Sequence, residues 1–384
     1  MSYPLEGIRV LDMSRVLAGP FAGRMLCDLG ADVVKVEPPD GDVTRSWGAD
    51  IGGSPGYYHQ QNVGKRNICV NLAASDGPGL IKALAAHADV LIENFRPGIM
   101  ARYGIGYPVL RALNPRLVML SISGFGQGGP ESERAAYAPI IHAESGLIAR
   151  QTRWGKGIPS DIAVSMADTN AGLHGLVAVL SALLMRARTG TGQHIDMAMI
   201  DATLVTDDAL HFGLEDSEHT KLLPSEVWET PAGSVLISAD FRHLWKLLTG
   251  VFGLEDPSPA AAPFEEKVEQ RRAIAQAYFR ELPDEPAFVA VMDRMNTAWG
   301  RVRESADIRE QPTVKHRATI IDVDDRAGGL RPVVQSPYRF SDAESGVQGP
   351  APWKGEHNVP VLRDWLGLGD GEIDSWRGAM IGPK

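Results

Sequence analysis

The sequence predicts an α/β protein with a parallel sheet, joined to a smaller α+β domain. The first reason is that short apolar runs of strand length alternate with helical segments over roughly the first 200 residues. The second is that the chain opens with a segment of the length of one βαβ unit. The third is a change of character near residue 205, after which amphipathic helices predominate.

The opening βαβ unit is the clearest of these patterns. Its parts are a buried-strand pattern over 8–14 (IRVLDMS), a helix over 20–30 that a glycine ends, and a second strand over 31–37. The turn between the first strand and the helix reads SRVLAGP and contains no GxGxxG. The unit has the size of a nucleotide-binding half, but a nicotinamide cofactor is disfavoured because that turn lacks the glycines that cradle a pyrophosphate.

The same alternation continues along the chain. The expected elements are a strand over 66–72, a helix over 77–87, strands over 89–95 and 116–126 with a helix over 107–113 between them, a helix over 135–149, a long helix within 165–193 and a strand over 194–199. After residue 205, a short strand pair precedes two amphipathic helices, over 241–253 and 267–282. Residues 220–320 therefore read as the smaller α+β domain, and a strand within 333–341 and a helix within 352–368 can return to the first domain.

Composition excludes several classes of partner. The net charge is −10, from 38 Lys and Arg against 48 Asp and Glu, and no basic block is present, so nucleic acid is not expected. No apolar run approaches the ~18 residues of a membrane span, and the start lacks a leader pattern, so we expect no membrane partner and a cytoplasmic location. Cys27 and Cys69 read as packing residues, and the His and Cys residues show no metal-ligand spacing, so no metal site is expected.

Asp168 lies at the threshold of the long apolar helix. Leucine and valine recur at three- and four-residue spacing after it, which predicts a helix buried along at least one face. Asp168 or Thr169 would begin this helix, and aspartate is among the best N-cap residues. Arg186 and Gly190 suit its C-terminal end. A capping role is by itself enough to explain an aspartate at the start of this helix.

Several long motifs, in the same order, resemble the class III coenzyme A transferases, the group of formyl-CoA transferase, carnitine CoA-transferase and bile-acid CoA-transferase that also contains α-methylacyl-CoA racemase. The resemblance covers most of the chain. It is carried by LEGIRVLDMSRVLAGPFAGRMLCDLGADVVKVEPPDGDVTR, GKRNICVNL, ADVLIENFRPG, LNPRLVMLSISGFGQGGP, ADTNAGLHGLVAVLSALLMRARTGTGQHIDMAMIDA, PYRFS and GEH. In that family the aspartate that opens the buried helix is the nucleophile, and Asp168 matches it. The resemblance implies that cap and nucleophile are one residue.

The implied reaction transfers CoA from an acyl-CoA to a small carboxylic acid through an aspartyl-CoA thioester on Asp168. A carboxylate with a reference pKa of ~3.9 is ionised at neutral pH and needs no general base to become a nucleophile. One thioester is exchanged for another, so the resemblance implies no ATP and no tightly bound cofactor, with coenzyme A itself as the substrate. Each step develops an oxyanion, which requires preorganised N–H donors.

The resemblance also implies a CoA site. The positions that match family residues lining it, together with Arg15 of the first turn, are Arg15, Val16, Ala18, Asn94, Phe95, Arg102, Tyr137 and Met199. Ala73 and Ala135 stand where formyl-CoA transferase places lysines near CoA, so phosphate contacts are expected to differ. The run of glycines that covers the formyl-CoA transferase site is absent from residues 220–240, and the GFGQGGP turn is the alternative glycine source of N–H donors.

Two other functions stay open at this point. Racemisation needs two acid/base groups, and the racemases carry a histidine where this chain has Tyr137, whose reference pKa of ~10 makes it a poor base. His142 lies five residues further on, out of register for a simple replacement. The second alternative is a non-catalytic CoA-binding scaffold that keeps the fold, against which the intact Asp168 motif argues.

The fold that the resemblance implies is a large Rossmann-like domain, with its parallel sheet built from both chain ends, and a small domain from the middle of the chain. The expected boundaries are 1–205 and 325–384 for the large domain, 220–320 for the small domain, and linkers at 206–219 and 321–324. The resemblance further implies an interlocked homodimer.

Overall fold

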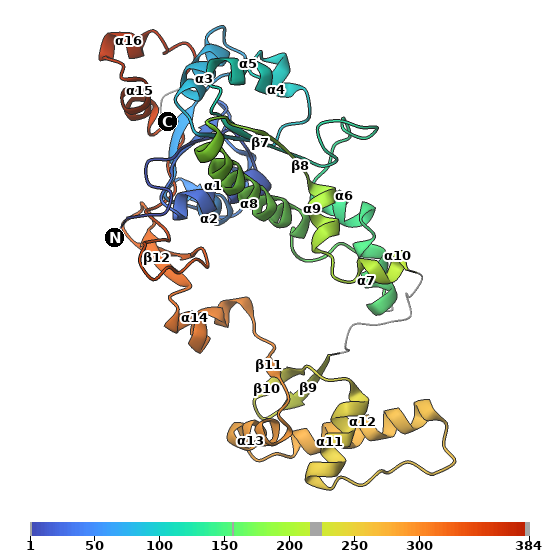
Figure 1. Ribbon diagram of the computed structural model, residues 1–384. Coiled ribbons are helices and arrows are strands. Elements are labelled where there is room, and N and C mark those ends of the chain that lie inside the picture. Colours follow the sequence, from blue (N-terminus) through green and yellow to red (C-terminus); the bar gives the residue numbers. More distant parts are fainter. Residues whose placement is uncertain (1, 156, 216–224, 381–384) are drawn as a thin grey trace. The chain divides into compact units, whose positions relative to one another are not determined.

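The computed structural model describes residues 2–155, 157–215 and 225–380 (Figure 1). They divide into two compact units, Met1–Asp207 with Lys315–Lys384, and Asp208–Val314. Part of the expected linker at 206–219 and the expected start of the small domain at 220–224 lie outside the described residues.

The larger unit is built on a six-stranded sheet in which every neighbouring pair of strands is parallel. This confirms the predicted α/β class. The order is β5-β2-β1-β6-β7-β8. The strands are β1 (Arg9–Asp12), β2 (Asp32–Glu37), β5 (Arg66–Cys69), β6 (Val90–Glu93), β7 (Val118–Ser123) and β8 (His194–Ala198). The chain reverses its direction of travel across the sheet between β1 and β6, and ligands of open α/β sheets bind beyond the carboxyl ends of strands at such a point.

Helices cover both faces of this sheet (Figure 1). Successive side chains of a strand point to opposite faces of the sheet. Val10 therefore belongs to one buried cluster and its neighbour Leu11 to the other. Near-continuous apolar strands are what a parallel sheet covered on both sides requires. On the Val10 side lie α1 (Ala18–Asp28), α6 (Ala138–Glu144), α8 (Met166–Thr189) and α9 (Met199–Thr206), and on the Leu11 side α3 (Gly77–Ala86), α4 (Ile99–Arg102), α5 (Tyr107–Leu113) and α15 (Asn358–Leu366).

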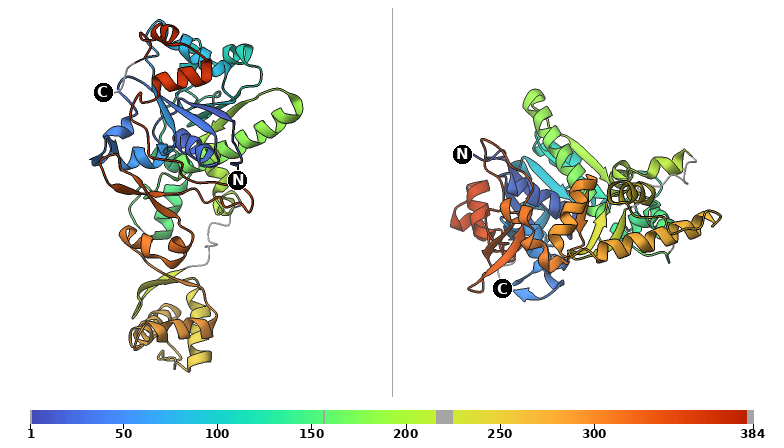
Figure 2. Two further views of the ribbon diagram at one scale, coloured as in Figure 1. Left: turned by 90° about the vertical axis from the view of Figure 1, so that its left-hand side faces the viewer. Right: turned by 90° about the horizontal axis from the view of Figure 1, so that it is seen from below.

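The C-terminal segment returns to the larger unit as a helix. Helix α15 packs against β5 and α3, and Figures 1 and 2 show the red C-terminal helices on the larger unit. Met380 forms an isolated antiparallel bridge with Val70. The expectation that both chain ends build the parallel sheet is wrong for the described residues, since all six strands come from Arg9–Ala198. The reason is that β12 (Ile320–Asp324) and β13 (Leu330–Val334), which are neighbours in the chain, pair with each other in an antiparallel hairpin.

The expected helix over 135–149 is two helices. It breaks at Gly146, whose φ of 83° lies in the left-handed region that ends α-helices, so α7 (Leu147–Gly155) begins after it. The other elements of the larger unit and its junction are η1 (Val43–Ser46), β3 (Asp50–Ile51), β4 (Ser54–Pro55), α2 (Gly56–Asn62), α14 (Pro312–His316) and α16 (Asp370–Asp374).

In its described residues, the smaller unit joins a three-stranded antiparallel sheet to four α-helices and a short 3-10 helix. The sheet order is β11-β10-β9, and the pairing of β9 with β10 confirms the expected strand pair. Its buried cluster is rich in aromatic rings, with Phe279 packed edge-on against Trp228 and Phe288. The elements are α10 (Leu210–Leu214), β9 (Glu226–Thr230), β10 (Gly233–Ile237), α11 (Phe241–Phe252), α12 (Phe264–Arg280), α13 (Glu285–Met295), β11 (Trp299–Arg301) and η2 (Ser305–Glu310).

Helix α8 corrects one expectation from composition. Its length and apolar composition alone would allow it to cross a membrane. The expectation that no apolar run approaches the length of a membrane span is therefore wrong. Its buried side packs on α1, β7 and β8 as part of the core, and a core helix passes the same test of composition. Its other side leaves Leu173, Val177 and Leu184 at 44, 60 and 66% exposure.

Candidate active site

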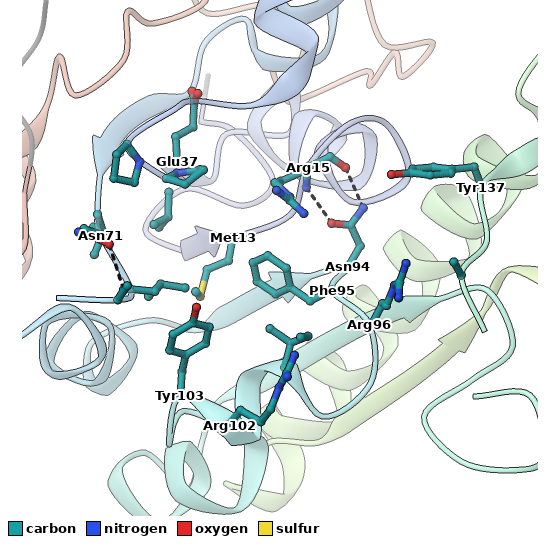
Figure 3. Close-up of a pocket in the computed structure, with 18 of the residues that line it drawn as sticks. Met13, Arg15, Glu37, Asn71, Asn94, Phe95, Arg96, Arg102, Tyr103 and Tyr137 are labelled. Atoms are coloured by element: carbon teal, nitrogen blue, oxygen red, sulfur yellow. Dashed lines mark hydrogen bonds between the residues drawn. The ribbon is translucent and has the colours of Figure 1, made fainter. Parts of the chain in front are cut away.

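The turn after β1 is held in a strained conformation by two side chains. Val16 has a φ of 68°, which a β-branched residue rarely adopts. On one side Asn94, which follows β6, accepts the N–H of Arg15 and donates to its carbonyl, each at 2.7 Å (Figure 3). On the other side Asp42 accepts the N–H of Val16 at 3.2 Å. Strain of this kind persists only where the surroundings impose it, and it is concentrated at functional sites.

Asp42 is anchored by a buried ion pair. Its carboxylate lies 3.1 Å from Lys35 Nζ, and both side chains are fully buried. Burial acts to raise the pKa of Asp42, but the charge of Lys35 and hydrogen bonds from Thr44 outweigh it and hold that pKa below its ordinary value. The carboxylate therefore stays ionised and keeps its hold on Val16.

Asp168 lies in the first turn of α8 and does not cap the helix. The helix begins two residues earlier, and its N-cap residue Ser165 makes no side-chain cap bond. The expectation that Asp168 or Thr169 is the cap is therefore wrong. The physical reason is tertiary, because an orphan N–H of the first turn, that of Ala167, is accepted by the imidazole of His142 from another helix.

Gly172 brings α8 close to the start of α1. It lies one helical turn after Asp168, so the two residues share a helix face. A Cβ atom at Gly172 would come within 2.7 Å of the Ala18 carbonyl oxygen and 2.8 Å of the Phe21 ring. The missing side chain thus lets the helices approach closely and carries the Asp168 carboxylate to the first turn of α1.

The Asp168 carboxylate accepts two backbone N–H groups. They belong to Ala18 and Ala138, the first residues of α1 and α6. Burial raises the pKa of Asp168 to about 6, although these two hydrogen bonds act to lower it. At pH 7 the carboxyl group is still mostly ionised, so it is a desolvated anion facing two fixed donors.

Two cavities share lining residues around the turn after β1. The larger has a volume of about 620 Å³ and the smaller, which Asp168 lines, about 250 Å³. Figure 3 shows Arg15, Phe95 and Arg96 along the larger one. The sequence-derived residues that line the smaller cavity are Arg15, Val16, Ala18, Asn94, Phe95, Tyr137, Asp168 and Met199. Arg102 lines the larger cavity, as do Ala73 and Ala135.

Sequence reasoning missed two polar groups in these cavities. Arg96 lines both cavities and follows Asn94 and Phe95 in the same turn, so its place in the ENFRPG motif was the available signal. Ser123, at the end of β7, lines the smaller cavity, and its hydroxyl is buried without a hydrogen-bond partner in the described part of the chain. The cavity with Asp168 therefore offers a guanidinium group and a free hydroxyl to a ligand.

The GFGQGGP turn does not supply the donors that face Asp168. Of its glycines only Gly124, which precedes Phe125, lines the smaller cavity, while Gln127 donates its backbone N–H to the Asp196 carboxylate. The backbone N–H groups that face the Asp168 carboxylate come instead from the helix starts at Ala18 and Ala138.

Tyr137 and His142 occupy different environments. Tyr137 lines both cavities and is 67% exposed. His142 is fully buried and lines neither cavity. Because its Nε2 lone pair accepts the Ala167 N–H, that lone pair is not available to a substrate, which weighs against racemisation with His142 as the base.

Among residues 2–155, 157–215 and 225–380, no three His, Cys, Asp or Glu side chains are grouped so that they could jointly hold a metal ion.

Comparison with known proteins gives consistent matches over nearly the whole chain. Residues 5–358 match CoA-transferase family III. A succinate–glutarate CoA-transferase of Agrobacterium fabrum is 34% identical, over 94% of this chain and 95% of that protein. A succinyl-CoA–D-citramalate CoA-transferase of Chloroflexus aurantiacus is 31% identical, over 96% of each. A CaiB/BaiF family protein from Brucella suis has a similar structure, with a TM-score of 0.80 and 33% identity over 95% of this chain and all of that one.

Proposed function

The chain belongs to CoA-transferase family III, and from this premise we propose that it moves coenzyme A from an acyl-CoA to a carboxylic acid through a thioester on Asp168. The observation that carries the assignment of the nucleophile is the environment of that carboxylate. It is partly buried, lines a cavity and accepts two backbone N–H groups from different helices. A desolvated carboxylate is a stronger nucleophile than a hydrated one, and the donors are in place before charge develops.

The proposed reaction has four steps. A carboxylate oxygen of Asp168 attacks the thioester carbonyl and expels the CoA thiolate, which leaves a mixed anhydride. The thiolate then attacks the aspartyl carbonyl and expels the donor acid as a carboxylate. The acceptor carboxylate attacks the resulting aspartyl-CoA thioester and expels the thiolate again, which finally attacks the acceptor carbonyl and frees Asp168. No proton and no further cofactor is consumed, because one thioester replaces another.

In each tetrahedral intermediate at the aspartyl carbon, negative charge develops on a former Asp168 oxygen. The N–H groups of Ala18 and Ala138 already bond this carboxylate. We assign them as the donors that stabilise the oxyanion, which is the role that preorganised backbone N–H groups perform in acyl transfer.

We assign CoA to the larger cavity. Its volume of about 620 Å³ suits a long ligand, and three guanidinium groups line it, those of Arg15, Arg96 and Arg102. Arginine is well suited to bind phosphate because its planar donors can form paired hydrogen bonds. Such local cations let an acidic chain bind an anionic ligand.

We propose a small dicarboxylic acid as acceptor. The relatives from Agrobacterium fabrum and Chloroflexus aurantiacus are named for glutarate and citramalate, both dicarboxylates. The smaller cavity supports the same class, because Arg15 and Arg96 line it together with Asp168. One carboxylate of the acceptor reacts at Asp168, and a guanidinium group can pair with the other.

With succinyl-CoA as donor, we expect glutarate to be a better acceptor than valerate, which has the same carbon chain and one carboxylate. The ratio of kcat/KM is expected to be roughly 10- to 100-fold, because a hydrogen bond to a charged group contributes about 1.5–3 kcal/mol. Acyl-CoA products are measured by mass spectrometry. Equal rates for the two acids would refute the dicarboxylate assignment, and no transfer to any acid in a wider panel would refute the transferase reading.

We further propose that two chains form an interlocked homodimer. The exposed apolar stripe of α8, formed by Leu173, Val177 and Leu184 at 44, 60 and 66% exposure, supports it. These residues are spaced four and seven apart and so follow one side of the helix. Exposed apolar side chains along one side of a helix of a folded unit are typical of a protein–protein interface.

We expect the protein to sediment as a dimer at nanomolar concentration, because interlocked chains cannot separate without unfolding. Substitution of Val177 by Arg places a charge in the stripe and is expected to reduce dimer assembly. Analytical ultracentrifugation measures both. The exposed Val205, changed to Arg, provides a control outside the stripe. A wild-type monomer at nanomolar concentration contradicts the proposal.

A further inference from the structure

A buried histidine contacts the start of the helix that carries Asp168. His142 belongs to α6 and is fully buried. Its Nε2 atom accepts the backbone N–H of Ala167, the residue before Asp168, at 3.1 Å. Its Nδ1 atom lies 2.8 Å from a carboxylate oxygen of Asp161, in the segment that leads into α8. Both ring nitrogens are thus engaged.

These contacts define the protonation of the ring. A nitrogen accepts a hydrogen bond only when it carries no proton, so Nε2 is bare and the single proton resides on Nδ1. That proton is donated to Asp161, and the same carboxylate oxygen accepts the N–H of Ile162 at 2.9 Å. Asp161 therefore fixes both the tautomer and the orientation of His142.

The contact replaces an ordinary helix cap. The first turn of a helix has N–H groups without intrahelical partners, and the side chain of Ser165 satisfies none of them. The imidazole bonds one of these groups from a different helix. The first turn of α8 is consequently tied to α6.

Helix α6 carries a second contact to the same place. Ala138, whose N–H bonds the Asp168 carboxylate, lies four residues before His142, and residues four apart share one helix face. One face of α6 thus holds the Asp168 side chain through Ala138 and the adjacent backbone through His142. Together the two hydrogen bonds fix the position of the Asp168 carboxylate relative to the N–H of Ala138.

We infer that His142, oriented by Asp161, is a positioning residue that holds the Asp168 carboxylate against the N–H of Ala138. The inference rests on the proposed role of Asp168 as the nucleophile. His142 touches neither substrate nor the reacting atoms. Its effect is on the geometry of the attack, where a displacement of about 1 Å can cost ~10²-fold in rate.

The test compares His142→Leu with His142→Gln. Leucine fills space but accepts no hydrogen bond, so kcat is expected to fall about 10²-fold while the KM for acyl-CoA changes little. The side-chain carbonyl of glutamine can accept the Ala167 N–H, and His142→Gln is expected to recover most of the lost kcat. Single-turnover formation of the Asp168 adduct, trapped by hydroxylamine, should show the same order of rates.

A second pair of variants covers the case in which His142→Leu does not fold. Asp161→Asn keeps an oxygen that accepts the Nδ1 proton and is expected to retain near wild-type kcat. Asp161→Ala removes it and is expected to lose roughly 10-fold, because the ring can then adopt the other tautomer. Nitrogen-15 NMR of labelled histidine in the wild-type dimer should show His142 protonated at Nδ1 alone.

The inference would be overturned by wild-type kcat in His142→Leu, by no recovery in His142→Gln, or by an Nε2-protonated ring in the wild type. Failure of the proposed function is distinguishable, because wild-type protein would then form no Asp168 adduct at all. An adduct that forms equally fast in wild type and His142→Leu leaves the transferase mechanism standing and removes only the positioning role.

Discussion

Asp168→Asn is expected to abolish CoA transfer while the protein still folds and keeps its oligomeric state. Asparagine has nearly the shape of aspartate, but its amide is not an anionic nucleophile. Loss of a nucleophile removes the covalent route, so we expect kcat to fall roughly 10⁴-fold or more. The measurement is transfer from succinyl-CoA by mass spectrometry, with hydroxylamine trapping in parallel. Wild-type protein should give a hydroxamate on Asp168 and the variant none.

The matched control is Asp201→Asn, in the first turn of α9, where the side chain is exposed and lines neither cavity. It should transfer at the wild-type rate. An Asp168→Asn protein that transfers normally would refute the nucleophile, provided that intact mass excludes deamidation back to Asp.

The raised pKa of Asp168 predicts a second measurable effect of Asp168→Asn, on thermal stability. Burial raises the pKa to about 6 in the folded chain, against ~3.9 in an unfolded one. The folded state thus binds the proton more tightly, so this group lowers stability as pH rises from about 4 to 6, and the destabilisation persists at pH 7. Asp168→Asn should therefore raise Tm at pH 7 relative to wild type.

The wild-type kcat/KM should fall as pH drops below about 6, because the protonated carboxyl group does not attack.

Ala138→Pro is expected to lower kcat by roughly 10²–10³-fold, the effect of removing one oxyanion donor. Proline has no N–H, so it deletes the bond to the Asp168 carboxylate. The backbone suits the change, because Ala138 is the first residue of α6, where proline is favoured. Tyr137 before it is extended, with φ −129° and ψ 172°, as a residue before proline prefers. Steady-state kinetics, with circular dichroism as the check on folding, measures the effect.

Ala138→Gly is the control for this donor. Glycine keeps the N–H and the position of the backbone, so it should retain kcat within a few-fold. A proline variant as active as the glycine variant would contradict the assignment of the Ala138 N–H as a donor to the oxyanion.

Much of the fold was predictable because it depends on short-range pattern. The strand-like runs and helical periods predicted six strands that the structure places in one parallel sheet, since a segment that is apolar along its length must be covered on both faces. The errors concerned where helices end and which strands pair with one another. Gly146 divided an expected helix, and the strand ending at Val334 paired with its neighbour in the chain instead of joining the sheet.

The sequence by itself determined the family motifs and, through them, Asp168 as the candidate nucleophile and the turn at Arg15 and Val16 as its surroundings. It placed Asp168 at the start of a helix because apolar spacing locates a helix to within a turn. It could not specify the direction of the carboxylate or what it meets there. That direction decides whether aspartate is a cap or a reactive group.

Only the tertiary structure decided the environment of Asp168. The N–H groups that bond it come from Ala18 and Ala138, which are 150 and 30 residues away along the chain, and the helix cap comes from His142. These groups meet because Gly172 lets α8 approach α1 and because one face of α6 carries two of the contacts. Hydrogen bonds depend on distances of a few ångströms and on N–H direction, and the packing of three helices sets both, whereas local sequence pattern does not.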